Sequence, residues 1–180
     1  MLEIKRYGYR HLKNVLVSVA VQFRPKHYLE IGVREGDSIK ALITHHKPLS
    51  MVVCDTWGST YGGSGRGNPK HIIELLKELR YEGECIFLNG QSQDMIPQLE
   101  GRKKFDLILV DGDHSYKGAY TDLVNCWKIL NPGGHIIFDD VVASTSPWLY
   151  MCAQTFLRRN KDVKLLYYDY KDNGVMVFQK

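Results

Sequence analysis

The stretch YLEIGVREGDS, residues 28–38, passes from an apolar run into a glycine-containing turn and then into a helical pattern. Gly32 and Gly36 stand four residues apart, where a missing side chain allows a tight turn and a close approach of the backbone to a ligand. A strand, a turn and a helix in this order form one unit of an α/β domain. The first glycine of the dinucleotide pattern G-x-G-x-x-G is absent, which disfavours a nicotinamide cofactor.

Short apolar runs and amphipathic windows alternate along the rest of the chain, as they do in repeated β-α units around a parallel sheet. The predicted strands cover 27–31, 51–54, 85–88, 105–110, 135–138, 163–168 and 174–178. The predicted helices cover 9–23, 37–46, 69–81, 92–99, 116–130 and 147–160. The break Lys-Asp-Asn-Gly at 171–174 is typical of a hairpin turn. We therefore predict a Rossmann-like three-layer α/β sandwich, with a mainly parallel seven-strand sheet that ends in an antiparallel C-terminal hairpin.

Length and composition fit a single domain. With 180 residues, of which 44% are hydrophobic and 24% charged, the chain is long enough to bury a core without disulfides or structural metals. Residues 1–26 are expected to form an N-terminal helical segment, 27–142 the cofactor-binding core, and 143–180 a C-terminal helix and hairpin.

Charge and cysteine usage exclude several classes of protein. The 24 Lys and Arg residues are interspersed with 20 Asp and Glu residues, so the net charge of +4 forms no basic stripe for a nucleic acid. No apolar stretch approaches the roughly 20 residues that a membrane-spanning helix needs, and no signal-peptide pattern opens the chain. The four cysteines lack metal-finger spacing, which favours reduced thiols in a cytoplasmic protein.

Polar or glycine-rich clusters follow five of the predicted strands. In an open parallel sheet, ligands bind beyond the carboxyl ends of the strands, near the point where the strand order reverses. The clusters are Glu30 with Gly32, Asp55, Gly90 to Ser92, Asp111 to His114, and Asp139 with Asp140. Asp55 alone would also fit a solvated carboxylate at a strand end. A glycine turn followed about twenty residues later by an acidic side chain, which accepts hydrogen bonds from a ribose diol, favours a nucleoside-containing ligand.

The ordered motifs of the chain resemble those of the class I S-adenosylmethionine-dependent methyltransferases. These motifs are Leu29-Glu-Ile-Gly32, Asp55, Gly90-Gln-Ser92, the run 105–111 and Leu130-Asn-Pro-Gly-Gly134. Two further stretches, Val110-Asp-Gly-Asp-His-Ser-Tyr116 and Phe138-Asp-Asp140, look most like the small stand-alone branch related to catechol O-methyltransferase and the cephalosporin hydroxylase-like proteins. The resemblance covers residues 28–142 and implies methyl transfer to an oxygen, or less readily a nitrogen, of a small-molecule acceptor.

The resemblance also implies which residues bind S-adenosylmethionine. Glu30 and Gly32 would shape the methionine pocket, Asp55 would hold the ribose, and Gln91 with Ser92 would border the adenine. The further residues expected to bind the cofactor are Gly36, Gly90 and Asp111. Ser38 would lie near the methionine carboxylate.

The catechol-type relatives hold a divalent ion, and the resemblance places Asp111, Asp139 and Asp140 at its ligand positions. Mg²⁺, which prefers oxygen ligands, is the expected ion. The alternative is that Asp139 and Asp140 cap a turn while Asp111 bonds to backbone amides. His114 stands where those relatives carry a lysine base, and an imidazole with a pKa near 6.5 accepts a hydroxyl proton at neutral pH. His114 and Asp111 are the predicted catalytic residues, and His114 would equally serve to orient Asp111 or to bind a metal.

Two other functions stay open from the sequence. One is a nicotinamide-dependent oxidoreductase, and the other is a domain that binds a nucleoside ligand without catalysis. The segment 58–67 has five glycines in ten residues and follows Trp57, so Trp57 and Tyr61 would cover a ligand from a loop whose role is open. The amphipathic segment 9–23 would close the site if it packed across a homodimer.

Overall fold

Seven strands form one sheet in the order β3-β2-β1-β4-β5-β7-β6 in the computed structural model, which describes residues 2–58 and 67–180. The strands are β1 His27–Ile31, β2 Ser50–Asp55, β3 Glu84–Asn89, β4 Phe105–Val110, β5 Leu130–Asp139, β6 Lys164–Asp169 and β7 Val175–Gln179. The pairs among β1 to β5 are parallel, whereas β7 is antiparallel to both β5 and β6. The strand order reverses between β1 and β4, so the predicted fold class is confirmed.

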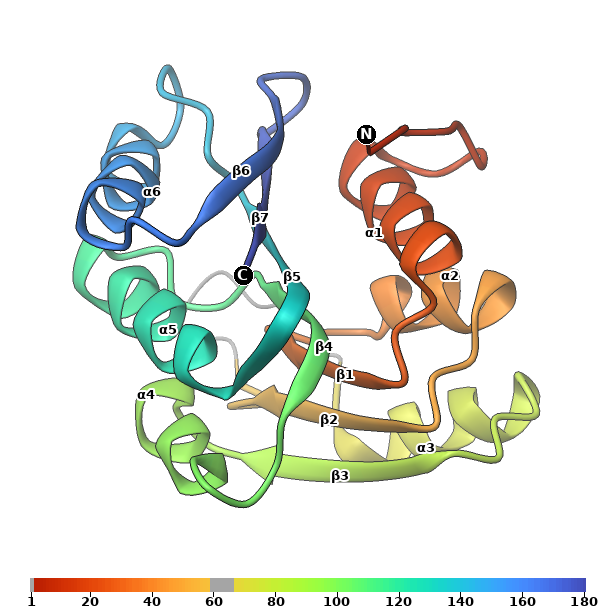
Figure 1. The fold of residues 1–180 in the computed structure, drawn as a ribbon. Coiled ribbons are helices and arrows are strands. Elements are labelled where there is room, and N and C mark those ends of the chain that lie inside the picture. Colours follow the sequence, from red (N-terminus) through yellow and green to blue (C-terminus); the bar gives the residue numbers. More distant parts are fainter. Residues whose placement is uncertain (1, 59–66) are drawn as a thin grey trace.

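Helices cover both faces of this sheet and divide the core into two layers (Figure 1). One layer packs α1 (His11–Phe23), α2 (Asp37–His45) and α3 (Pro69–Glu78) against the sheet. The other packs α4 (Ser92–Met95), the 3-10 helix η1 (Ile96–Leu99), α5 (Tyr116–Ile129) and α6 (Pro147–Arg159). None of the helices in the described residues is long and apolar enough to cross a membrane.

The helix predicted at 69–81 ends at Glu78, other elements differ by one or two residues at an end, and two predicted elements differ in kind or extent. The helix predicted at 92–99 is split into α4 and η1, because Pro97 has no N–H to continue the α-helical hydrogen bonds. The strand predicted at 135–138 begins at Leu130 instead, which pairs with Phe105. The register then shifts until His135 pairs with Leu107, so the Asn-Pro-Gly-Gly segment lies within the bounds of β5 as an irregularity and not ahead of it.

The C-terminal hairpin is the one predicted from 171–174. The Gly174 N–H donates to the Lys171 carbonyl over 3.0 Å, and Gly174 has a φ of +79°. The turn also accepts hydrogen bonds from Val141 and Val142, directly after β5. A Cβ on Gly174 would lie 2.5 Å from a Val142 side-chain carbon. The hairpin turn is therefore held at the carboxyl end of β5.

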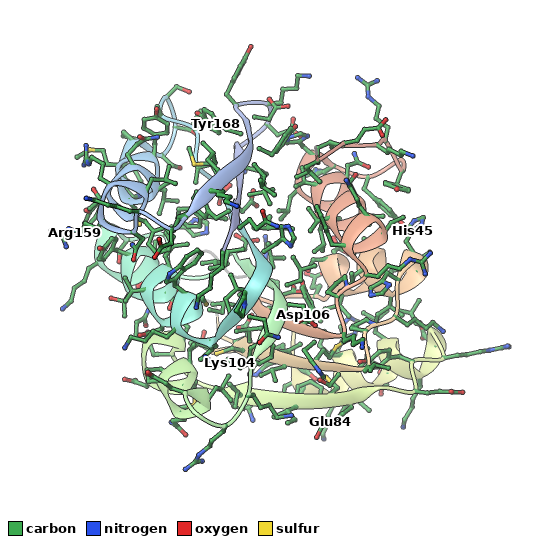
Figure 2. The ribbon with its side chains drawn as sticks, in the orientation of Figure 1. His45, Glu84, Lys104, Asp106, Arg159 and Tyr168 are labelled. Atoms are coloured by element: carbon green, nitrogen blue, oxygen red, sulfur yellow. The ribbon has the colours of Figure 1, made fainter. Side chains whose placement is uncertain are left out.

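Asp106, which is labelled in Figure 2, lies at the amino ends of the strands, away from the hairpin turn. One of its oxygens accepts hydrogen bonds from the backbone N–H groups of Lys26 and His27, and the other accepts from the Asn131 side chain over 2.8 Å. These bonds join the amino ends of β1, β4 and β5, and the carboxyl ends are left to form a site.

Candidate functional site

A cleft of about 930 Å³ lies at the carboxyl ends of the strands, around the point where the strand order reverses. Most of the predicted site residues line it: Gly32, Ser38, Asp55, Gly90, Gln91, Ser92, Asp111, His114, Asp139 and Asp140. Glu30 and Gly36 are not among its lining residues. Glu30 is fully buried behind Ser38, and Gly36 precedes α2 with a φ of +79°.

Gly32 and Asp111 form the floor of the cleft, where β1 and β4 separate. The Gly32 N–H donates to the Cys54 carbonyl, and the Asp111 N–H donates to the Ile31 carbonyl, both over 3.0 Å. Gly32 has a φ of +85°, and a Cβ at this position would lie 1.8 Å from the Asp111 carbonyl oxygen. Only glycine therefore allows these two strand ends to approach each other and to leave an open floor.

Asp55, at the end of β2, accepts hydrogen bonds from the loop after β1 and from the loop after β2. Its Oδ2 accepts hydrogen bonds from the backbone N–H groups of Val33 at 2.7 Å and Arg34 at 2.9 Å, and its Oδ1 accepts from Trp57 at 2.6 Å. A carboxylate has about four lone-pair directions, so three protein bonds leave it capacity for a further donor. The Trp57 indole also donates to Asn89, which fixes the ring beside the end of β3.

Glu30 accepts two hydrogen bonds inside the sheet. The Tyr28 hydroxyl donates to its Oε2 over 2.6 Å, and the Ser38 hydroxyl donates to its Oε1. Burial raises the pKa of Glu30 to about 7, against the lowering effect of these two hydrogen bonds. Glu30 itself does not line the cleft, and the hydrogen bond from Ser38 connects it to a residue that does.

A second buried carboxyl lies behind the other end of the cleft. Asp122, on α5, has no exposed surface, and its Oδ2 accepts a hydrogen bond from the Ser92 hydroxyl over 3.0 Å. Its Oδ1 has no partner within the described part of the chain, and burial raises its pKa to about 7. Gln93 lines the cleft beside Ser92, and its buried amide nitrogen likewise lacks a partner there. Gln93 was not among the residues predicted from the sequence. Its position directly after Gln91 and Ser92 was the signal that could have indicated it.

Asp111, His114 and Asp140 form a compact group at the end of β4 and β5. The His114 Nε2 lies 3.5 Å from Asp111 Oδ1 and 3.3 Å from Asp140 Oδ2, and one ligand atom from each residue lies within 4.8 Å of the others. The hydrogen bond with Asp111 raises the pKa of His114, and burial raises the pKa of Asp111. The Trp148 indole donates to the His114 carbonyl over 2.6 Å, which ties this loop to α6.

Asp139 is not part of this group of three, although it lines the same cleft. Burial raises the pKa of Asp139, and the nearby charges of Asp111 and Asp140 raise it further. The structure thus brings Asp111 and Asp140 together as predicted and adds His114 to them. The role of Asp139 as a metal ligand stays a prediction.

One wall of the cleft was not predicted from the sequence, because it joins a segment near the N-terminus to a segment near the C-terminus. Arg10 to Lys13 line the cleft from the start of α1, and Lys171 to Val175 line it from the hairpin turn. The His11 Nε2 lies 3.5 Å from Asp169 Oδ2, and its backbone N–H donates to Asp172 over 3.4 Å. No local pattern signals such a contact.

The glycine-rich segment contributes Gly58 and Gly67 to the lining of the cleft. A Cβ on Gly67 would lie 1.7 Å from the Arg34 carbonyl oxygen, so this residue also has to be glycine. Residues 59–66 lie outside the described residues, and so does the cover predicted for Tyr61, whereas Trp57 lines the cleft.

Comparison with known proteins gives one family. A family model described as a methyltransferase domain matches residues 29–141, which is more than half of the chain. A curated relative, an uncharacterized protein of Acanthamoeba polyphaga mimivirus, is 27% identical over 122 residues. That match covers 63% of this chain and 50% of the relative, so the chain spans about half the length of the curated protein it matches.

Three solved structures illustrate the likeness in fold. The O-methyltransferase TomG from Streptomyces achromogenes, in complex with S-adenosylmethionine, is 21% identical with a TM-score of 0.72, and the match covers 93% of this chain and 78% of that one. An O-methyltransferase from Bacillus cereus, with S-adenosylhomocysteine, is 20% identical with a TM-score of 0.69, covering 99% and 84%. The N-methyltransferase NodS from Bradyrhizobium japonicum is 18% identical with a TM-score of 0.63, covering 93% and 85%.

Proposed function

The chain belongs to the methyltransferase domain family, and we propose that it transfers a methyl group from S-adenosylmethionine to an oxygen of a small-molecule acceptor. The observation that carries this proposal is the cleft at the β1–β4 reversal, where the predicted cofactor residues gather at one edge of the sheet. An oxygen acceptor is favoured over nitrogen because O-methyltransferases are frequent among the structures of similar fold. The family match gives no support to the nicotinamide-dependent alternative.

The residues of the cleft suit the parts of S-adenosylmethionine. We assign Gly32 and Ser38 to the methionine part, the remaining lone pair of Asp55 to the ribose, and Gln91 with Ser92 to the adenine. When bound, S-adenosylmethionine would supply a methyl group on a sulfonium sulfur. The chain's own contribution is to hold the acceptor in line with that methyl group, since alignment alone replaces up to about 7–11 kcal/mol of entropy cost.

His114 is proposed as the base. As the new oxygen–carbon bond forms and the sulfur–carbon bond breaks, the acceptor hydroxyl has to lose its proton, and the neutral imidazole of His114 accepts it. Asp111 and Asp140 lie within 3.5 Å of His114 Nε2 and stabilise the imidazolium that results. Their negative charge and the hydrogen bond to Asp111 raise the pKa of His114, which makes it a stronger base.

A divalent ion at the same group is a second candidate, because two carboxylates and an imidazole within 4.8 Å are a suitable donor set. Asp111, His114 and Asp140 would hold it, with Asp139 as a further oxygen ligand from the cleft wall. An ion there would supply a Lewis acid that lowers the pKa of a bound hydroxyl. A neutral imidazole has one ring-nitrogen lone pair, which serves either the ion or the acceptor proton, so the two roles of His114 exclude each other.

Calorimetric titration tests the proposed cofactor. S-Adenosylmethionine and S-adenosylhomocysteine should bind with one site per chain, and NAD should give no heat. Binding of NAD without either nucleoside would overturn the proposal. Binding of both nucleosides without turnover across a panel of hydroxylated acceptors would instead support a domain that binds its ligand without catalysis.

Activity in excess chelator separates the two roles of His114 once an acceptor is found. If His114 is the base, turnover persists with chelator, and His114→Ala slows it by roughly 10²–10⁴-fold with loss of the acidic limb of the pH profile. If an ion is needed, chelator abolishes turnover, and Mn²⁺ binds the wild type but binds Asp140→Asn more weakly. Asp162→Asn, which alters an exposed carboxylate outside the cleft, is the control.

A further inference from the structure

Three oxygen-bearing side chains link the core of the sheet to the cleft. Tyr28 and Glu30, both on β1, have no exposed surface, and the Tyr28 hydroxyl donates to Glu30 Oε2 over 2.6 Å. Ser38, in the first turn of α2, donates to Glu30 Oε1. Ser38 also lines the cleft, whereas Tyr28 and Glu30 do not. Of these three side chains, Ser38 is therefore the one whose hydroxyl can form a hydrogen bond with a ligand in the cleft.

The direction of these hydrogen bonds depends on whether Glu30 carries a proton. An ionised carboxylate only accepts hydrogen bonds, so both hydroxyl protons then point at Glu30, and Ser38 presents lone pairs alone to the cleft. A protonated carboxyl has one O–H to donate, and its neighbours here are the Ser38 and Tyr28 oxygens.

Tyr28 decides which of the two receives that proton. Within residues 2–58 and 67–180, the Tyr28 hydroxyl has Glu30 as its hydrogen-bond partner and no other. If Glu30 donated to Tyr28, the Tyr28 proton would be left buried without an acceptor, which costs about 1–3 kcal/mol. Tyr28 therefore keeps donating to Oε2, and the carboxyl proton belongs on Oε1, facing Ser38.

We propose that Tyr28 and Glu30 set the hydrogen-bond polarity of Ser38, so that a ligand carboxylate placed at Ser38 binds together with one proton on Glu30. With Glu30 protonated, Ser38 accepts from Oε1 and is free to donate its own proton into the cleft. With Glu30 ionised, Ser38 faces the cleft only as an acceptor, which suits an ammonium group. This inference rests on the proposed function, because the methionine part of S-adenosylmethionine carries both groups.

The surroundings of Glu30 keep both its protonated and its ionised form accessible near neutral pH. Its pKa is raised to about 7, chiefly by burial and to a lesser degree by the charges of Asp111 at the end of β4 and Asp55 at the end of β2. The hydrogen bonds from Ser38 and Tyr28 act in the opposite direction. Cys85, on β3, is the other titratable group that senses its charge, and burial keeps that thiol neutral with a pKa of about 12. A charged ligand group beside Ser38 is thus sufficient to change the protonation of Glu30 near pH 7.

Calorimetry with S-adenosylhomocysteine at pH 8, in phosphate and in Tris with excess chelator, measures the protons taken up on binding. The wild type should take up a large fraction of one proton per site, because most Glu30 is ionised at that pH before binding. Glu30→Gln, which is neutral at every pH, should bind without proton uptake. Tyr28→Phe removes a hydrogen bond that favours the ionised state, so its uptake at pH 8 should be smaller than that of the wild type.

Asp122→Asn is the matched control. Asp122 is also fully buried, also has a pKa raised to about 7 and also accepts a hydrogen bond from a cleft serine, Ser92. Its variant should keep the proton uptake of the wild type. Loss of uptake in Asp122→Asn together with persistence in Glu30→Gln would overturn the inference.

A second probe separates this inference from the proposed function. 5′-Methylthioadenosine lacks the amino-acid part of the cofactor, so it should bind without proton uptake at Glu30. Binding of S-adenosylhomocysteine by the wild type with no proton uptake would refute the role of Glu30 and leave the methyltransferase proposal intact. If neither nucleoside binds, the proposed function fails and this inference fails with it. Circular dichroism checks that each variant is folded, and Tyr28→Phe provides the test if Glu30→Gln is not.

Discussion

At the residue scale, Gly32 carries the close backbone approach between the ends of β1 and β4. Gly32→Ala would place a methyl group 1.8 Å from the Asp111 carbonyl oxygen, on a backbone with a φ of +85°. We expect a loss of more than about 3 kcal/mol in the free energy of unfolding, because both left-handed strain and a clash between strand ends apply. Urea denaturation measures the loss.

Gly101→Ala is the control for that experiment. Gly101 has a φ of +76°, but a Cβ there would meet no atom within 4 Å. It should therefore cost only the left-handed strain of about 1–2 kcal/mol. Equal losses in the two variants would contradict the assignment of Gly32 to a close crossing of β1 and β4.

The buried carboxyl of Asp122 makes stability depend on pH. Because burial raises its pKa from 3.8 to about 7, the folded state binds this proton more tightly than the unfolded state. The free energy of unfolding contributed by Asp122 therefore falls as pH rises from about 4 to about 7 and is then constant. Asp122→Asn should remove this fall, which amounts to at most about 4 kcal/mol at 1.36 kcal/mol per pKa unit.

Urea denaturation at pH 5 and pH 8 checks the expectation for Asp122. The difference between the two pH values should shrink in Asp122→Asn and stay unchanged in Asp162→Asn, whose carboxylate is exposed. His135 acts in the opposite direction, because burial lowers its pKa to about 4. Its contribution is common to all three proteins and cancels. An unchanged pH difference in Asp122→Asn would show that the carboxyl is already ionised at pH 5 in the folded protein.

At the element scale, the caps of α3 and α5 are comparable hydrogen bonds with different neighbours. Asn68 accepts a hydrogen bond from the His71 N–H, and Ser115 accepts one from the Gly118 N–H, each over 3.0 Å. Replacing either capping residue with Ala should cost about 1 kcal/mol of stability. Only Ser115 directly follows His114, so only Ser115→Ala should also weaken Mn²⁺ binding at the acidic group. Equal Mn²⁺ affinity in both variants would contradict this.

Strands were easier to predict than helix ends, for a physical reason. Strands β1 and β4 have the predicted bounds, 27–31 and 105–110, because a strand buried on both faces is a mainly apolar run bounded by polar or glycine residues. The Asn-Pro-Gly-Gly segment instead combines the end of a helix with the start of a strand. It ends a helix, as predicted, but Leu130 still pairs with Phe105, since tertiary packing continues the sheet where local propensity favours a break.

At the scale of the whole molecule, the topology explains which part of the site could be predicted. Parallel strands deliver their carboxyl ends to one edge, so Asp55, Ser92 and Asp111 were expected to meet once the strands were placed. The buried partners Tyr28 and Asp122 and the wall from α1 and the hairpin depend on packing between distant segments. A single sequence carries no periodic signal for such contacts, and they emerged only from the structure.

The wall that joins the two ends of the chain gives the last prediction. Asp169 accepts a hydrogen bond from Tyr167 over 2.9 Å and from the Lys171 N–H over 3.0 Å, and it lies 3.5 Å from His11 Nε2. Asp169→Ala removes the acceptor that all three groups share, so the start of α1 and the hairpin turn should separate more often. Hydrogen exchange of the Asn14 amide, which donates to the Arg10 carbonyl over 3.2 Å, should then speed up by roughly tenfold, which corresponds to about 1.4 kcal/mol of local stability.

The amides of β1 lie in the centre of the sheet and should exchange at the wild-type rate in Asp169→Ala, since the core layers on both faces are untouched. Asp162→Ala removes an exposed carboxylate that lies ahead of β6 and should leave both segments unchanged. Faster exchange throughout the molecule would mean that Asp169 supports global stability. Unchanged exchange at Asn14 would mean that α1 is held by its apolar face alone, because Val15, Leu16 and Val19 are fully buried against the sheet whatever happens at its first turn.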